Sequence, residues 1–344
     1  MARRLLWASL ALVPATILAD VAFDVGKVAL FVLAALALIP LAWLIGESTE
    51  HAAVHTGPRI GGLLNASFGN APELIISMIA IADGLPDVVR GSLAGSVISN
   101  VLLVLGAALV FGRDARLDRR SLLGQLALVV FAVLVLLVPS IPGWSGDPNR
   151  HSLAILGIVP SIVLLVVYVV TLTRGLRGTL PQEEETHGTG WSLRASLAVL
   201  GVATVATAFI SEIFVHSLEA FAHAVGLSEF FIAIVIVAIV GNAAEHGGAV
   251  VIAHRGNMRL ATEIAVSSSA QVAVLLIPAI ALLSFFFSDP LTLAFRPIEL
   301  AAMGGSAAFV AFVLRDGRSK RWEGALLIGV YTGLALVFLA VGDR

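Results

Sequence analysis

Two short motifs place an asparagine and a glutamate in the middle of apolar sequence. They are GNAPE, residues 69–73, and GNAAE, residues 241–245, which lie 172 residues apart. Carboxylate, amide and backbone oxygens are the ligands of hard cations, and Ca²⁺ takes about six to eight of them. Two glutamates also neutralise a divalent ion. The residues predicted to form such a cage of oxygens are Gly69, Asn70, Glu73, Gly241, Asn242 and Glu245.

The same pair of carboxylates also favours the binding of protons. When no cation is present, two close carboxylates in a low dielectric cannot both stay charged. The predicted site therefore has two neutral occupancies, one divalent cation or two protons. This mutual exclusion is the physical basis of a cation/proton antiporter, because only the neutralised states change access at low cost.

Helix capping is the alternative role of the two glutamates. Asn favours the N-cap position, Gly permits a break before it, and Pro72 fits only a first helical turn. A glutamate three residues after the cap then closes a capping box. A break at mid-membrane is tolerated only where the freed carbonyls face a polar cavity. The capping role therefore leads to the same site.

The elements that must hold this site are membrane helices. Of 344 residues, 58% are hydrophobic and 13% are charged, whereas about 25% are charged in a soluble domain. A span needs about 20 apolar residues, and residues 91–112, 152–173 and 264–288 carry no charge. The alternating segments of a membrane β-barrel are absent. We predict an all-α polytopic membrane protein.

Charge and cysteine content exclude several other classes. A net charge of −2 gives no support for nucleic-acid binding, and the absence of cysteine excludes disulfides, zinc–thiolate sites and iron–sulfur clusters. No HExxH motif or mid-membrane Ser–His pair supports an intramembrane hydrolase. We expect a protein that is not an enzyme, has no cofactor and works in a lipid bilayer. A homo-oligomer is compatible with the sequence.

We predict eleven spans in two five-helix repeats. The spans lie near residues 5–20, 28–50, 60–82, 88–112, 121–142, 152–173, 194–222, 229–253, 260–288, 291–314 and 323–342. The division is residues 1–22 for an extra N-terminal helix, 24–174 for the first repeat, 175–193 for an acidic cytosolic linker and 194–344 for the second repeat. The first span is also compatible with a cleaved signal peptide, because Arg3 and Arg4 precede fifteen apolar residues.

Basic residues set the predicted orientation. With the N-terminus inside, inner segments hold 16 of the 21 Lys and Arg residues and outer segments hold 5. The odd span count then places the C-terminus outside. The arginine-rich, alanine-rich composition favours a bacterial inner membrane. In the linker, Glu183–Glu185 form either a solvated connector or a segment that attracts cations.

An ungapped alignment of residues 69–100 with residues 241–272 indicates an internal repeat. It has six identities, four of them inside the two motifs. The matched spans are the third and the eighth, which cross the membrane in opposite directions. This is the signature of an inverted-topology repeat, in which substrate binds near the midplane between the repeats.

Further polar residues are candidates for support of the site or for a proton pathway. Ser96, Asn100 and Gln271 occupy the fourth and ninth spans, although membrane hydroxyls often bond only their own helix. The other candidates are His246 beside the second motif, Glu212, His216 and Glu219 on one face of the seventh span, and Glu50 near the inner end of the second. Long polar side chains can instead extend to the interface.

These motifs resemble the calcium/proton exchangers (CAX) of the calcium–cation antiporter superfamily. The resemblance covers nearly the whole chain and is most specific in GPRIGGLLNASFGNAPELIISMIAI, GSVISNVLLVLGAALVFG and SSSAQVAVLLIPAI. It implies the 5+5 repeat with an extra first span, and export of Ca²⁺ against inward H⁺. It also implies that Glu73 and Glu245 are ligands shared by Ca²⁺ and protons, and that Glu50 and Glu212 match further acidic positions.

Alternatives within the transporter class stay open. Pro72 gives the first motif a likeness to the sodium/calcium exchanger branch, whose motifs carry Ser or Thr hydroxyls just before it. Asn70 in that neighbourhood and the pair Glu245–His246 favour the proton branch. A Na⁺-coupled exchanger of Ca²⁺ or another divalent cation is therefore the closest alternative. A passive channel is disfavoured by the predicted inverted repeat.

Overall fold

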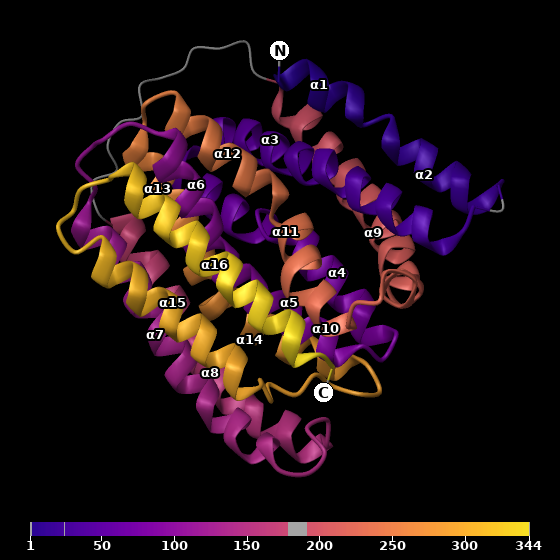
Figure 1. Cartoon of the computed structure of the whole chain (residues 1–344). Helices are drawn as coiled ribbons and strands as arrows, with labels where there is room; N and C mark the ends of the chain where they lie inside the picture. Colours follow the sequence, from indigo (N-terminus) through magenta and orange to yellow (C-terminus); the bar gives the residue numbers. More distant parts are fainter. Residues whose placement is uncertain (1, 24, 178–190, 344) are drawn as a thin grey trace.

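The computed structural model describes residues 2–23, 25–177 and 191–343. In these ranges the chain is helical throughout, apart from turns, loops and one isolated bridge between Arg116 and Arg318. Figure 1 shows the helices packed side by side in one bundle. The acidic residues Glu183–Glu185 of the predicted linker lie outside the described residues.

The N-terminal segment is helical and lies on one side of the bundle. It consists of α1 (Ala2–Ser9) and α2 (Leu12–Val21), and α2 contacts both α3 (Lys27–Phe68) and α9 (Leu193–Val225). Together they form a candidate span, Arg4–Ala22, of which little is buried by the rest of the chain. This position at the periphery agrees with an extra helix outside the repeats.

The internal repeat is also seen in where four consecutive elements begin and end. Each element in the first half has a counterpart whose first and last residues are both 172 positions later. The pairs are α4 (Ala71–Ala82) with α12 (Ala243–His254), α5 (Pro86–Ser99) with α13 (Met258–Gln271), η1 (Asn100–Val104) with η4 (Val272–Leu276), and α6 (Leu105–Phe111) with α14 (Ile277–Leu283). The structure therefore supports the repeat well beyond the sequence identities.

Two spans are broken at the motifs GNAPE, residues 69–73, and GNAAE, residues 241–245, which are called the GN motifs below. The segment Glu229–Gly241, comprising α10 (Glu229–Phe231), η3 (Ile232–Val237) and α11 (Ala238–Gly241), meets α12 at an angle of 59°. In the first repeat α3 ends at Phe68 and α4 begins at Ala71. A second interruption lies inside α3, where Gly57 has φ 79° and ψ 169°, a left-handed φ that favours glycine. The expected second span, 28–50, is therefore longer, and runs helically to Thr56.

The span count is compatible with the prediction but does not establish it. In the described ranges, eight helices are long and apolar enough to cross a membrane, or nine if the bent pair counts as one span. The two other expected spans correspond to α4, with 12 residues, and to α15 (Pro297–Val313), with 17. The fold class, an all-α polytopic membrane protein, is confirmed, and the number eleven stays a prediction.

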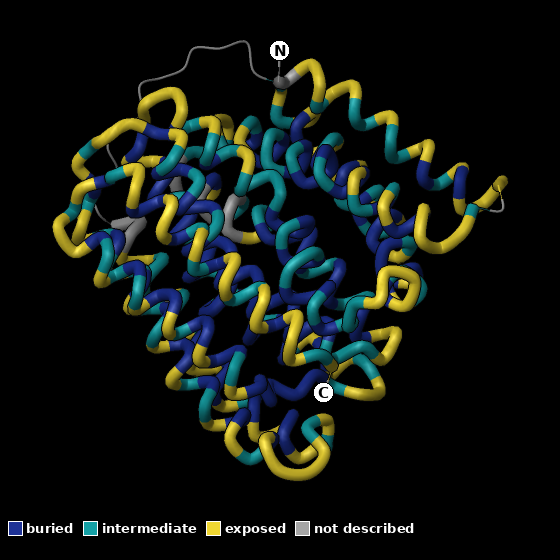
Figure 2. The backbone as a smooth tube through the Cα atoms, in the orientation of Figure 1, coloured by how far each residue is buried: buried dark blue, intermediate teal, exposed yellow. Residues whose placement is uncertain are grey.

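The helices α5 and α13 lie in the middle of the bundle. Of the most apolar window of Pro86–Phe111, 83% is buried, and the dark blue centre of Figure 2 reflects this burial. Close packing requires glycine here, because a Cβ on Gly95 would lie 2.0 Å from the backbone oxygen of Ile234 in η3. The π-helical segments η1 and η4 follow directly, and such segments often mark functional sites.

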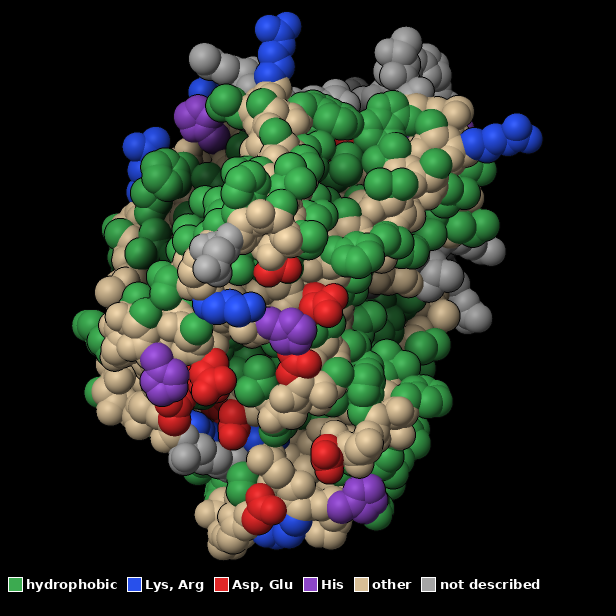
Figure 3. All heavy atoms as spheres, turned by 90° about the vertical axis from the view of Figure 1, so that its right-hand side faces the viewer, with side chains coloured by type: hydrophobic (Ala, Val, Ile, Leu, Met, Phe, Trp, Pro, Cys, Tyr) green, Lys and Arg blue, Asp and Glu red, His purple; other side chains and the backbone are tan. Residues whose placement is uncertain are grey.

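The peripheral helices present apolar surface. They are α7 (Arg119–Ser140), α8 (His151–Arg177), α15 and α16 (Arg321–Val341). Exposed side chains such as Phe131, Val159 and Leu336 fit contact with lipid. Figure 3 shows a further face that is hydrophobic in its upper half, with Asp, Glu and His side chains gathered lower down.

Candidate functional site

The two GN motifs form hinges between half-helices. Asn70 has φ −98° and ψ 16°, and Asn242 has φ −95° and ψ 10°, so both leave helical geometry in the same way. The backbone oxygen of Asn70 accepts a hydrogen bond from Leu74 N at 3.1 Å, and that of Asn242 accepts one from His246 N at 2.9 Å. Each asparagine therefore occupies the N-cap position of the half-helix that follows.

The capping box, which the sequence offered as the alternative role of the two glutamates, is not formed. Neither asparagine side chain makes a capping hydrogen bond. The reason is that both amide groups turn across the interface between the repeats. Asn70 Nδ2 donates to Gln271 Oε1 at 3.3 Å, and Asn242 Nδ2 donates to Ser96 Oγ at 2.8 Å.

A polar network joins the repeats around Asn100. This residue is fully buried, and its Nδ2 donates to Asn242 Oδ1 at 3.4 Å and to Ser268 Oγ at 3.1 Å. Asn242 Nδ2 also donates to Ala238 O at 2.8 Å, so every polar atom of that amide is engaged. Asn242 links the repeats here, and its role as a cation ligand stays a prediction.

Glu73 reaches from the first repeat to the second motif. Its side chain is 6% exposed and lies against Gly241, where an added Cβ would sit 3.0 Å from Glu73 Cγ and 3.5 Å from Cδ. The carboxylates of Glu73 and Glu245 are close enough to interact by charge. Because Gly241 has no side chain, the backbone of one motif and the carboxylate of the other share this space.

Glu245 occupies the corresponding position at the start of α12 and is only partly exposed. Its Oε2 accepts a hydrogen bond from the hydroxyl of Ser268. Ser268 is 3% exposed and is the repeat counterpart of Ser96. The sequence indicated Ser268 as a matched position of the alignment and as one of the polar residues of SSSAQ, and the structure adds its direct contact with Glu245.

Three buried acceptor oxygens in this region have no donor. They are Asn70 Oδ1, Glu73 Oε2 and Asn100 Oδ1, none of which has a hydrogen-bond partner among the described residues. A buried polar atom without a partner costs about 1–3 kcal/mol, and all three are oxygens that a hard cation accepts as ligands. The buried site between the repeats is therefore rich in oxygen atoms that a cation or a proton would satisfy.

Comparison with known proteins identifies the family. The profile of the sodium/calcium exchanger protein family matches residues 26–174 and 195–340. This chain belongs to the sodium/calcium exchanger protein family. The resemblance inferred from the motifs is confirmed, and the division into two repeats stays a prediction.

Relatives within the family include proteins named for proton coupling. The chain is 38% identical to the "Ca(2+)/H(+) antiporter ChaA" of Bacillus subtilis, over 90% of this chain and 91% of the relative. It is 34% identical to the "Ca(2+)/H(+) antiporter" of Aphanothece halophytica, over 91% and 90%. A solved structure, "Structure of native YfkE", has a TM-score of 0.84 at 35% identity and covers 97% of this chain and 99% of its own.

More distant family structures share the fold. The "Crystal Structure of H+/Ca2+ Exchanger CAX" has a TM-score of 0.76 at 17% identity, covering 98% of this chain and 91% of that one. At this identity the likeness concerns the fold alone.

Other predicted residues form no hydrogen bond to this network among the described residues. Glu50 on α3 and Glu212 on α9 are exposed. His216 is about half exposed, and its Nε2 lies 3.1 Å from Asp83 Oδ2 at the end of α4. Glu219 is 71% exposed and lies 3.8 Å from His223. Their predicted roles in a proton pathway stay predictions, and Asp83 is a partner that sequence reasoning missed.

His246 follows Glu245 on α12 but makes no hydrogen bond to the network among the described residues. Its Nε2 is buried and has no hydrogen-bond partner in the part of the chain that the structure describes. The neighbouring position of the two residues on one helix directs their side chains about 100° apart. A role for His246 in sensing pH stays a prediction.

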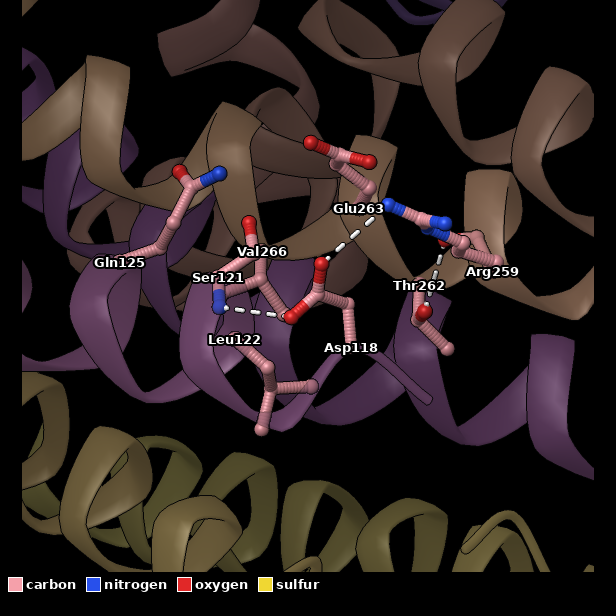
Figure 4. A pocket seen from close by; sticks show the side chains of 8 residues that line it. All are labelled: Asp118, Ser121, Leu122, Gln125, Arg259, Thr262, Glu263 and Val266. Atoms are coloured by element: carbon pink, nitrogen blue, oxygen red, sulfur yellow. Dashed lines mark hydrogen bonds and ion pairs between the residues drawn. The ribbon is translucent and has the colours of Figure 1, made fainter. Parts of the chain in front are cut away.

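A separate polar hollow lies at the start of α7. It is lined by Asp118, Ser121, Arg259 and Glu263, among others, with a volume of about 10 Å³, room for about one water molecule. Figure 4 shows Asp118 between Ser121, whose N–H it accepts at 3.2 Å, and Arg259, at 3.3 Å. It contains none of the predicted ligands, and the contacts are those of a helix cap with an exposed ion pair.

Proposed function

We propose that this chain is a secondary active antiporter that exports Ca²⁺ from the cytosol in exchange for H⁺. The observation that carries the proposal is the set of unpartnered oxygens of Asn70, Glu73 and Asn100 between the two repeats. Both carboxylates begin half-helices, where the partial positive charge of the helix N-terminus favours an anionic side chain. Together they supply two negative charges for one divalent ion.

Glu73 and Glu245 are the central ligands in this proposal. Asn70 Oδ1 adds a neutral oxygen, and the interrupted helices near Gly69 and Gly241 add backbone carbonyls. Ser268 donates its hydroxyl hydrogen to Glu245 in this structure. That hydroxyl must rotate when Ca²⁺ takes the carboxylate, and its oxygen is then free to contribute to the site. Protons that neutralise both glutamates would leave no charge for Ca²⁺, so the two substrates exclude each other.

Alternating access follows from the hinged architecture. The half-helices α4 and α12 begin at breaks at Asn70 and Asn242. The long helix α3 packs against α9 and against both half-helices, and α9 packs against α4. Rocking of one group of helices against the other around a fixed midplane site is the usual mode of such repeats. The proposal requires that the site change access when it is neutralised by either substrate.

The names of the relatives support H⁺ as the coupling ion. The first motif supports H⁺ as well, because it lacks the Ser or Thr hydroxyls of the sodium/calcium exchanger branch. Asn70 occupies that neighbourhood instead. A Na⁺-coupled exchange of Ca²⁺ or another divalent cation is the alternative. We assign no enzymatic activity, no cofactor and no nucleic-acid partner. We further propose a bacterial inner membrane, with the N-terminus in the cytoplasm and the C-terminus outside.

Flux measurements test the proposal. Purified protein is reconstituted into liposomes, and ⁴⁵Ca²⁺ uptake is driven by a pH gradient and, separately, by a Na⁺ gradient. We expect uptake with the pH gradient that collapses when a protonophore is added. Uptake that needs Na⁺ instead would establish the alternative, and uptake without either gradient would indicate a passive pathway.

A further inference from the structure

Two loops on the predicted cytoplasmic face are fastened together by backbone hydrogen bonds. Leu117 N donates to Gly317 O at 2.9 Å, and Ser319 N donates to Ala115 O at 3.0 Å. Ser319 is buried, and its Oγ accepts a hydrogen bond from Ala115 N at 2.8 Å. These contacts join the loop after α6 to the loop before α16, so the basic side chains of both loops are held on one rigid support.

A hollow of about 510 Å³ lies beside this support. The residues that line it are Arg113, Asp114, Lys320, Arg321 and Trp322. Three of the five are basic and one is acidic, so the lining has a net charge of +2. The fifth is an aromatic side chain that is 61% exposed. The combination is suited to an anionic group that carries an apolar part.

Arg113 and Arg321 provide the charge that is available to a ligand. Lys320 is already engaged, because its Nζ lies 2.6 Å from Asp316 Oδ2 and 3.2 Å from Glu323 Oε1. Its hydrogen bond to Asp316 lowers the pKa of that carboxyl, which keeps the pair ionised. By contrast, the exposed guanidinium groups of Arg113 and Arg321 make no hydrogen bond or ion pair within the described residues.

The hollow lies where two spans reach the surface of the bundle. α16 begins at Arg321 and is a candidate span, and α6 ends at Phe111, two residues before Arg113. Phe111 is 58% exposed. Both span ends therefore combine an exposed aromatic ring with a free arginine. Exposed aromatic side chains and basic clusters at span ends lie at the headgroup level of a bilayer and attract anionic lipids.

We propose that this hollow binds the phosphate group of an anionic phospholipid from the adjacent leaflet. Arg113 and Arg321 contact the phosphate, and Trp322 packs against the glycerol and upper acyl region. The occupant is a lipid rather than a free anion because an exposed tryptophan borders the charge at the start of a span. The rigid support at Ser319 holds the two arginines, which belong to different repeats, at one lipid. This inference does not depend on the proposed antiport.

Binding of dioctanoyl-phosphatidylglycerol to the full-length protein in detergent tests the inference. Native mass spectrometry gives the dissociation constant of the first bound lipid, with dioctanoyl-phosphatidylcholine as the neutral comparison. We expect the double variant R113Q/R321Q to weaken phosphatidylglycerol binding about tenfold or more, since two charge-assisted contacts are lost. The matched control R116Q/R318Q changes the same two loops and the same net charge but does not line the hollow, so it should stay within about twofold of wild type.

The outcomes separate the inference from simpler explanations. Equal weakening in both double variants, or equal affinity for the two lipids, would overturn it in favour of diffuse charge or no site. Inorganic phosphate that displaces the lipid at equal concentration, with no effect of Trp322→Ala on lipid affinity, would show a free-anion site and overturn the assignment to lipid. The inference would be supported if Trp322→Ala lost phosphatidylglycerol binding while R116Q/R318Q kept it and phosphatidylcholine bound more weakly to wild type.

Discussion

Replacement of Gly241 by alanine should weaken Ca²⁺ binding through Glu73, which belongs to the other repeat. A Cβ at Gly241 would lie 3.0 Å from Glu73 Cγ, whereas carbon atoms in contact are about 3.5–4.0 Å apart. The carboxylate must therefore shift by about half an ångström or more. Glu73 is only 6% exposed, so the neighbouring side chains limit its retreat.

The size of the effect follows from the cost of overpacking. An added methyl group in a packed interior costs about 1–3 kcal/mol. If that cost falls on the Ca²⁺-bound arrangement, the dissociation constant rises by about 5- to 150-fold. We expect the lower part of this range, because the clash meets a flexible side chain rather than backbone. Calorimetric titration with Ca²⁺ and the KM of ⁴⁵Ca²⁺ uptake measure it.

Two further variants show whether the clash is the cause. Gly248→Ala lies on α12, the half-helix that follows Gly241, and its added Cβ would meet nothing within 4 Å, so its affinity should match wild type. Glu73→Asp shortens the side chain, so adding Gly241→Ala to it should cause little further loss. Wild-type affinity in Gly241→Ala, or independent losses that simply add in the double variant, would refute the assigned contact.

Three other predictions concern the two glutamates, Asn100 of the polar network, and the buried Arg90 at the start of α5. Glu73→Gln and Glu245→Gln should each abolish pH-driven ⁴⁵Ca²⁺ uptake while the melting temperature stays near wild type; retained uptake in either would contradict the shared-ligand role. Asn100→Ala leaves Asn242 Oδ1 without its donor and should lower unfolding free energy by about 1–3 kcal/mol, seen as a lower melting midpoint. Arg90→Gln loses the charged donors to Thr292 and Asn149 and should destabilise by about 3 kcal/mol, whereas exposed Arg120→Gln should not.

Sequence reasoning predicted the parts of the fold that depend on local pattern. The apolar runs gave the membrane helices, and the two GN motifs gave the breaks at Asn70 and Asn242. In the sequence the repeat showed only six identities. In the structure, the bounds of every element from α4 to α6 match those of the elements from α12 to α14. Helix breaks and hinge positions are under local backbone control, so they repeat even where the side chains differ.

Contacts between the repeats could not be predicted. The sequence offered capping as the alternative role of the two motifs, because capping is a local interaction. The structure directs both amides to Ser96 and Gln271 instead, which depends on how the two halves dock. The break at Gly57 falls between the predicted second and third spans, 28–50 and 60–82, so its place was predicted, whereas the further helical turns up to Thr56 were not. Glu50 and Glu212 were predicted from their places in the spans and from the family likeness, and the structure leaves both exposed, with no hydrogen bond to the network among the described residues.

Proton release on Ca²⁺ binding tests the central claim, that both substrates compete for Glu73 and Glu245, most directly. Calorimetric titrations in buffers of different ionisation enthalpy, at one pH, give the number of protons released per Ca²⁺ bound. The account predicts a release that approaches two at acidic pH, an apparent affinity that falls as pH falls, and no comparable release in Glu73→Gln. Ca²⁺ binding of equal affinity across pH with no proton release would contradict it.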